Sequence, residues 1–430
     1  MHPSISKNRR IRFNQKWGHI RPLLLLLLLP CIQLMAQTDA SKQNRERYTI
    51  YPLSISSAYS EMGPAIGPEG QLLFSSNRPV RSIIRRFNAR DRQAFYQLWE
   101  SRPTELTTLS APQAFAPQLS SPLNNGPLSF SADGRQMYLT RNSEGHSVAE
   151  LDIVLFSRLY DKWPREASSL PLKIRGYSIM HPAIAPDNER LYFASDMPGG
   201  YGGMDLYYSV RRGGFLSRPV NLGPQINSSG NEVFPYVDPE GRLFFASDGL
   251  PGAGGLDVFV SHILQNNFSP PLNLGAGLNS AADDFGFIWY QNEKSGYFVS
   301  NRPGGKGQDD LYAFEIRQDL GLFLMAGKVL NAQTGEPIGE VDIQVLLPNQ
   351  SNYQQTISAE DGSFSLLLWA DASYTFIFNK EGFTTLRKST AAKALSLPVV
   401  LPPLVTEQPE VPKEAETPKD SLLHLNNQWF

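Results

Sequence analysis

The chain has 430 residues, and its 34 glycines and 33 prolines make up about a sixth of it. That share of helix-breaking residues excludes a helical bundle, and the 11% aromatic content favours short strands joined by turns. The formal charge of −2 hides an asymmetry: residues 1–36 hold six basic residues and no acidic one, so the chain from Gln37 onward carries −8. Nucleic acid is therefore not an expected partner.

A basic start, a leucine run at 23–29 and a small residue at Ala36 predict a secretory signal peptide over 1–36. The leucine run is too short to cross a bilayer, and no second long apolar run follows, so no transmembrane span is expected. The single cysteine, Cys31, leaves with the signal. The alternative is a lipid anchor on Cys31, although a proline precedes it where such signals have a small residue. Residues 37–47 are expected to form a polar linker.

A sequence repeat follows the linker. Turn signals at 67–70, 131–134, 185–188 and 238–241 each precede a β-rich run, and a fifth run follows without such a turn. The aromatic residues that mark these runs are spaced by 64, 55, 52 and 53 positions: Phe74, Tyr138, Phe193, Phe245 and Phe298. A second marker recurs after each run, at 97–99, 152–154, 205–207, 257–259 and 310–312. Five units of nearly constant length are therefore present.

Each unit contains four short strand patterns, which is typical of a β-propeller blade. The fourth pattern is missing after the fifth unit, but a matching one stands ahead of the first unit, at 51–54. We therefore expect an all-β fold with a five-bladed β-propeller over 48–320. In this ring, residues 48–54 pair with 311–317 as the missing outer strand and leave no open edge.

One string of the fourth unit carries a family resemblance. It runs from Asn227 through Asn231-Glu232 and DPEG at 238–241 to FASD at 245–248 and GGLDVF at 254–259. This string resembles the WD40-like propeller repeats, also called PD40, of the TolB type. The resemblance covers residues 48–317 and is most specific in the last three units.

After the propeller, alternating strand patterns with glycine-containing turns predict a small β-sandwich over 322–403. Their order resembles the carboxypeptidase regulatory-like domain, a transthyretin-like sandwich without catalytic residues. Residues 404–430 are rich in Pro, Glu and Lys and are expected to form a disordered tail. The alternative is that the more apolar end of the tail, from Leu422 to Phe430, is a docking peptide.

A propeller and such a sandwich behind a signal peptide resemble the middle of Bacteroidota OmpA-family envelope proteins, one of them associated with type IX secretion, without the OmpA-like domain. The resemblance implies a non-enzymatic adaptor that is exported to the periplasm and associated with the outer membrane. Its partners would be envelope proteins, such as components of a secretion or envelope-integrity assembly. The alternative function is glycan or peptidoglycan binding.

The sequence predicts no catalytic, metal or cofactor site. The propeller histidines, His146, His181 and His262, fall in different units and lack the spacing of zinc ligands. The motif GHSVA at 145–149 resembles a nucleophile elbow around Ser147, but its last glycine is replaced and no α/β region accompanies it. A hydrolase is therefore the least supported alternative, and no cofactor is expected.

Glycine-rich loops at 199–203, 252–255 and 304–307 could be mistaken for phosphate cradles, but each joins two strands and opens no helix. We expect a structural role in which an aspartate of each unit caps the amides of its loop: Asp205, Asp257 and Asp310. Calcium binding is the alternative for these residues, although one carboxylate per loop is too few for a site.

The first unit carries an insertion of about 11 residues between Asn77 and Gln97. It contains five arginines and one aspartate and is the candidate docking patch for an acidic partner, lipid headgroups or glycan phosphate: Arg81, Arg85, Arg86, Arg90 and Arg92. The alternative is a solvated loop, because lengthening a loop costs little free energy.

Overall fold

The computed structural model describes residues 47–79, 94–120, 123–142, 150–172, 174–265, 267–290, 294–317, 321–370 and 372–404. These residues form β-strands and two short 3-10 helices, η1 (Pro117–Leu119) and η2 (Ala392–Ala394). In this part of the chain no helix is long and apolar enough to cross a membrane. The protein is all-β, as its composition predicts.

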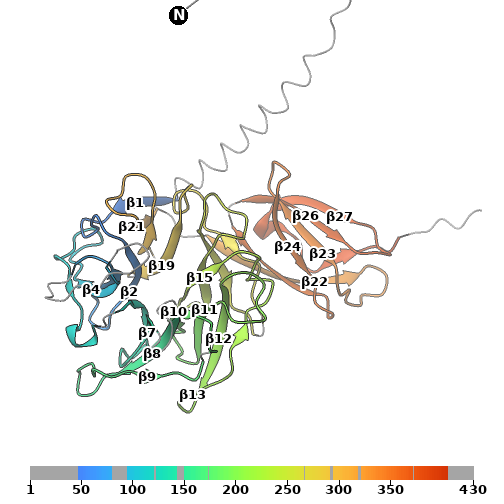
Figure 1. Ribbon diagram of the computed structural model, residues 1–430. Helices are drawn as coiled ribbons and strands as arrows, with labels where there is room; N and C mark the ends of the chain where they lie inside the picture. The colour runs from blue at the N-terminus through green and yellow to red at the C-terminus, as the bar shows by residue number, and fades with distance from the viewer. Residues whose placement is uncertain are drawn as a thin grey trace, which may run out of the picture.

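Five antiparallel sheets are arranged as blades around an axis (Figure 1). Blade 1 contains β2 (Glu61–Ile66), β3 (Leu72–Ser76), β4 (Gln97–Ser101) and β5 (Gln113–Ala114). Blade 2 contains β6 (Asn125–Phe130), β7 (Gln136–Asn142), β8 (Leu151–Ser157) and β9 (Ser168–Ser169). Blade 3 contains β10 (Ile179–Ile184), β11 (Arg190–Ser195), β12 (Asp205–Arg212), β13 (Phe215–Leu216) and β14 (Val220–Asn221).

Blade 4 contains β15 (Glu232–Val237), β16 (Arg242–Ser247), β17 (Asp257–His262) and β18 (Leu272–Asn273). Blade 5 contains β19 (Asp284–Tyr290), β20 (Ser295–Ser300), β21 (Asp310–Ile316) and, as its outermost strand, β1 (Tyr48–Pro52). The first strand of each blade is innermost, and these five strands contact one another around the ring. Consecutive residues of a second strand, such as Leu72, Leu73 and Phe74, are buried, because neighbouring blades cover both faces of the sheet.

The ring is closed by the N-terminal strand. Strand β1 pairs with β21 in antiparallel register from Tyr48 opposite Ile316 to Pro52 opposite Tyr312. The pairing of 48–54 with 311–317 that the sequence predicts is therefore confirmed. Closure joins chain segments more than 250 positions apart, so β21 is paired on both sides and β1 becomes the outermost strand of blade 5.

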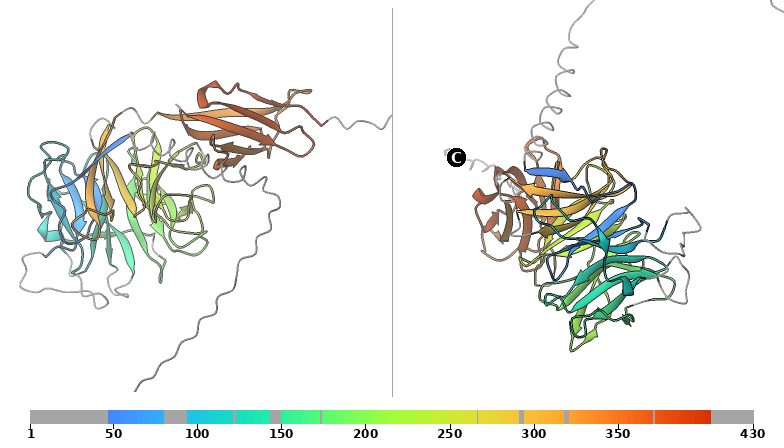
Figure 2. Two further views of the ribbon diagram at one scale, coloured as in Figure 1. Left: turned by 90° about the horizontal axis from the view of Figure 1, so that it is seen from above. Right: turned by 90° about the vertical axis from the view of Figure 1, so that its left-hand side faces the viewer.

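The C-terminal sandwich has two sheets. One contains β25 (Ser363–Trp369), β22 (Leu322–Asn331) and β28 (Val399–Leu401), and the other contains β24 (Asn352–Ile357), β23 (Asp342–Leu346), β26 (Ser373–Asn379) and β27 (Leu386–Ala391). Their facing sides share a core that includes Val329, Ile343 and Phe376. Figure 2 shows the sandwich as a separate body beside the ring.

The sandwich is packed against blades 4 and 5 by an apolar contact. Leu367 and Trp369 of β25 join the same buried cluster as Tyr48 and Phe314 of blade 5. The guanidinium of Arg47 lies 4.0 Å from the centre of the Trp369 ring, a cation–π contact. The side-chain amide of Gln354 donates to the carbonyl of Pro271 at 3.2 Å. The two domains therefore share a packed interface instead of being joined by the chain alone.

Candidate functional site

The five inner strands share one irregularity on the axis of the ring. In each, the pairing with the second strand shifts register at the same place, which is a β-bulge. The residue at the bulge has a positive φ in every blade, between 52° and 97°: Gly63, Gly126, His181, Phe234 and Gly286. A proline follows it in the first four blades. The bulge bends each strand at the wall of the central channel.

Glycine is required at the bulge in blades 1 and 2. A Cβ atom at Gly63 would lie 2.5 Å from the Pro127 ring, and one at Gly126 would overlap the Ser75 hydroxyl. The left-handed backbone adds strain for any residue with a side chain. Blades 3 and 4 are different because they place large side chains, His181 and Phe234, in this conformation.

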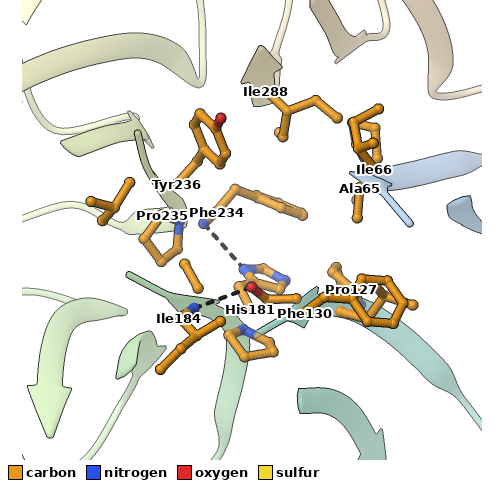
Figure 3. Close-up of a pocket in the computed structure, with 18 of the residues that line it drawn as sticks. Ala65, Ile66, Pro127, Phe130, His181, Ile184, Phe234, Pro235, Tyr236 and Ile288 are labelled. Carbon is orange, nitrogen blue, oxygen red and sulfur yellow. Dashed lines mark hydrogen bonds between the residues drawn. The ribbon is translucent and has the colours of Figure 1, made fainter. Parts of the chain in front are cut away.

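His181 and Phe234 contact each other. Their rings are stacked with centroids 3.8 Å apart and an angle of 18° between the planes. The backbone N–H of Phe234 donates to His181 Nδ1 at 3.4 Å, as the dashed line in Figure 3 shows. Two bulky residues in a left-handed conformation cost free energy, and strain of this kind concentrates at functional sites. The stacked pair therefore marks the axis as the candidate site.

The pair lines a pocket of about 300 Å³ on the propeller axis. All five inner strands contribute to it, and most of the wall is made of proline, aliphatic and aromatic side chains, among them Pro127, Phe130, Ile184, Tyr236 and Ile288 (Figure 3). No Asp, Glu, Lys or Arg is among the described residues that line it. The pocket is suited to an uncharged, largely apolar group.

The electrostatics of the pocket are set by His181. Burial lowers the pKa of its imidazole from 6.5 to about 3, so the ring is neutral at physiological pH. Because Nδ1 accepts a hydrogen bond from Phe234, the proton is assigned to Nε2. No described residue accepts a hydrogen bond from Nε2. A neutral donor is therefore left for a ligand.

Buried carboxylates lie at the first residue of several inner strands, where hydrogen bonds and ion pairs within the blade engage them. Glu61 Oε1 accepts from the Ser57 hydroxyl at 2.6 Å and from Arg78 Nη2 at 2.7 Å. In blade 5, Asp284 is paired with Arg302 at 2.6 Å. These pairs connect the start of a blade to the end of its second strand, so they hold blades together.

Blade 4 has a carboxylate at the same place without an arginine. Glu232 accepts hydrogen bonds from the hydroxyls of Ser228 at 2.5 Å and Ser247 at 2.7 Å. Burial raises the pKa of Glu232, and these hydrogen bonds oppose the rise. Two serines and a backbone amide from Ser228 satisfy its oxygens, so Glu232 is also a structural group.

The aspartates expected in the glycine-rich loops contact the loop amides. Asp205 accepts from the N–H groups of Tyr201 at 2.7 Å and Gly202 at 3.0 Å. Asp257 and Asp310 make the same contacts in blades 4 and 5. Among the described residues no group of three or more His, Cys, Asp or Glu side chains is arranged to hold a metal ion. The geometry is that of amide capping.

Other residues that the sequence singled out lie outside the described part of the chain. These are the docking-patch arginines Arg81, Arg85, Arg86, Arg90 and Arg92, the signal region with Cys31, the motif around Ser147 and the apolar end of the tail. The docking patch therefore stays a prediction.

The sequence interpretation missed Phe234 and gave His181 no role. A signal for both exists in the repeat, since His181-Pro182 and Phe234-Pro235 stand where Gly63-Pro64 and Gly126-Pro127 stand in blades 1 and 2. Aligning the units on this dipeptide would have shown two large residues in place of glycine.

No protein-family model matches the chain, and no curated protein matches it. Among solved structures, a glycoside hydrolase aligns with 66% of this chain and 96% of its own length, at 10% identity and a TM-score of 0.47. TolB from Acinetobacter baumannii aligns with 75% of this chain and 82% of its own, at 11% identity and a TM-score of 0.34. The α-L-arabinofuranosidase of Podospora anserina aligns with 64% of this chain and 98% of its own, at 11% identity and a TM-score of 0.38. Similarities this low carry no inference about activity or partners.

Proposed function

We propose that the protein is a non-enzymatic adaptor whose propeller axis binds an uncharged, apolar segment of a partner protein. The axial pocket supports this proposal, because five blades line it mainly with apolar side chains and place neutral hydrogen-bond donors such as His181 Nε2 among them. A peptide segment supplies both an apolar side chain and a carbonyl acceptor for His181 Nε2. A pocket lined in this way binds its ligand by apolar burial and a directed hydrogen bond.

The packed sandwich supports an adaptor role. Its contact with blade 5 through Trp369, Arg47 and Phe314 fixes the position of a second domain relative to the pocket. A partner on the propeller and one on the sandwich would then be held at a defined separation, which a flexible linker does not provide.

The proposed location is the periplasm, with association to the outer membrane, and the proposed partners are envelope proteins. These rest on the signal peptide expected at 1–36 and on the resemblance to Bacteroidota OmpA-family proteins with a carboxypeptidase regulatory-like domain. A type IX secretion or envelope-integrity assembly is the specific setting that this resemblance implies.

Glycan or peptidoglycan binding is the second candidate function, and the aromatic lining of the pocket is the observation that supports it. Phe130, Phe234 and Tyr236 could stack on a sugar ring. Sugars also need several polar partners, whereas the Ser129 hydroxyl oxygen already accepts from the Ile184 amide at 3.1 Å. An apolar peptide segment therefore fits the pocket better.

The test is affinity capture from an envelope fraction with a variant that obstructs the pocket. Ala132 is exposed and belongs to the pocket rim, so Ala132→Trp should cover the mouth without disturbing a core position. Ala253→Trp is the matched control, because Ala253 is also exposed but lies in a loop at the opposite end of the blades.

We expect the parent protein and Ala253→Trp to retain an envelope protein that Ala132→Trp loses. Addition of soluble peptidoglycan fragments should leave that capture unchanged. Loss of capture with such fragments would favour the glycan candidate, and equal capture by both variants would refute a role for the axial pocket.

A further inference from the structure

Two hairpins on one face of the ring carry exposed apolar side chains. The first follows β8, where Leu159 is 63% and Tyr160 98% exposed. The second joins β12 to β13, where Phe215 is 80% exposed. Each hairpin reverses through two residues with positive φ, Tyr160-Asp161 in the first and Gly213-Gly214 in the second, so both are tight turns. The apolar groups therefore stand at projecting tips.

The fold does not require an aromatic residue at these tips. In blade 3 the amide of Ser217 donates to the carbonyl of Val210, and in blade 4 the amide of Ser269 donates to the carbonyl of His262. Residue Phe215 thus stands where blade 4 has the polar Asn267. An aromatic ring held almost entirely in water has no packing role, and its position calls for another explanation.

Both hairpins are basic. The stretches 157–165 and 210–218 contain six basic residues and one acidic residue, whereas the chain from Gln37 onward carries −8. The basic residues are Arg158, Lys162, Arg165, Arg211, Arg212 and Arg218. Positive charge is therefore concentrated at the same two places as the exposed apolar groups.

A pocket of about 410 Å³ lies between the two blades at the base of the hairpins. Arg135, Arg158 and Arg211 line it, together with Asp133 and hydroxyl and amide side chains. Asp133 is engaged locally, since it accepts from the Ser131 hydroxyl at 2.6 Å and from the backbone N–H of Arg135 at 3.0 Å. Three guanidinium groups around one pocket favour a phosphate-bearing ligand.

The surface is held in place by its surroundings. Arg158 lies 5.2 Å from the centre of the Trp163 ring, and Trp163 packs against Phe130 with ring centroids 5.8 Å apart. The amide of Ala132 in blade 2 donates to the side chain of Asn188 in blade 3 at 3.0 Å. These contacts hold the first hairpin on blade 2 and join the turns of blades 2 and 3 beside the pocket.

We propose that the two hairpin tips and the arginine pocket dock this face of the propeller on a membrane that contains anionic phospholipid. Leu159, Tyr160 and Phe215 enter the interfacial layer, where aromatic side chains are stabilised, and the arginines bind lipid phosphates. A protein partner would need a matching cavity for each projecting tip, whereas a bilayer interface deforms around both. This docking is a second function, and it uses the face on which the rim residue Ala132 of the axial pocket also lies.

The test is co-sedimentation of the protein beginning at Gln37, the form expected after signal cleavage, with lipid vesicles. One set of vesicles is phosphatidylcholine alone, and the other contains phosphatidylglycerol in addition. The tip variant is Tyr160→Ser with Phe215→Ser, and the charge variant is Arg158→Gln with Arg211→Gln. The matched control is Tyr59→Ser with Tyr201→Ser, since these tyrosines are also exposed, at 43% and 51%, but lie on the opposite face.

We expect the parent and the control to bind vesicles with phosphatidylglycerol, with an affinity that falls as salt is raised. The tip variant should bind about tenfold more weakly, and the charge variant about fivefold more weakly for each arginine removed. A Phe215→Trp variant should show a blue-shifted emission with these vesicles alone. Because Phe215 is exposed, this substitution should not disturb folding, so a missing shift would mean that the tip does not enter the bilayer.

Failure of the parent to sediment with phosphatidylglycerol vesicles would overturn the proposal, as would equal binding by the tip variant and the control. Loss of protein capture by the tip variant without any vesicle binding would show instead a protein interface, and would also overturn it. The vesicle experiment contains lipid alone, whereas the capture experiment detects an envelope protein, so the two proposals are tested by separate readouts.

Discussion

The two faces of the propeller use their residues differently. On the loop face, formed by the glycine-rich loops and the starts of the inner strands, Glu61, Asp284 and Asp205 are all engaged in hydrogen bonds within the blades. On the turn face, formed by the turns after the inner strands and the hairpins after the third strands, Tyr160 and Phe215 project into solvent. The residues that recur from blade to blade stabilise the ring, and those that break the repeat are available for binding.

The largest effect is expected on the loop face. Arg78 is paired with the fully buried Glu61, so Arg78→Met leaves a carboxylate buried without its partner. Such a loss costs about 3–5 kcal/mol of unfolding free energy, measured by urea denaturation. Arg102→Met is the control, because Arg102 and Glu69 are both more than half exposed. Arg102→Met should leave the denaturation midpoint unchanged. If both variants lost a similar unfolding free energy, the buried ion pair would be no more important to stability than the exposed one.

The second prediction compares two glycines with positive φ. Gly126, on the axis, has φ 97° and no space for a Cβ atom beside Ser75, whereas Gly70, in a turn, has φ 76° and open space. Gly126→Ala should cost about 3 kcal/mol because backbone strain and overpacking add, and Gly70→Ala about 1 kcal/mol from the backbone alone. Thermal or urea unfolding measures both. Equal losses would mean that the axial wall tolerates side chains at every blade.

The third prediction concerns pH and the stacked pair. Burial lowers the pKa of His181 to about 3 in the folded protein, while the unfolded chain has the ordinary value of 6.5. The stability that this neutral histidine supplies is complete above pH 6.5 and is lost as the pH falls, because the unfolded state then binds the extra proton. The loss amounts to about 2 kcal/mol by pH 5.

The matched variant for this measurement is His181→Gly, which the left-handed backbone accepts. Other groups, such as Glu232 and Asp257 with their raised pKa values, titrate in both proteins and cancel in the difference. The parent should lose stability more steeply than the variant between pH 6.5 and pH 5. Parallel pH profiles would show that His181 titrates normally and that the pocket is wet.

Most of the fold could be predicted from the sequence because the repeat imposes it. A strand pattern missing after the fifth unit and present before the first unit was enough to predict that β1 pairs with β21. The candidate site could not be predicted in the same way. Its residues, such as Ile66, Phe130 and Ile288, belong to different blades. In the sequence their pattern is that of ordinary core positions, and only the closed ring brings them together.

The sequence by itself determined the number of blades, the closure of the ring and the strand-rich C-terminal domain, because each follows from local patterns and their spacing. Only the tertiary structure decided that His181 and Phe234 stack across two blades and that the hairpins of blades 2 and 3 flank one arginine pocket. The physical reason is that strand patterns are local, whereas a pocket depends on distances between residues that are far apart in the chain.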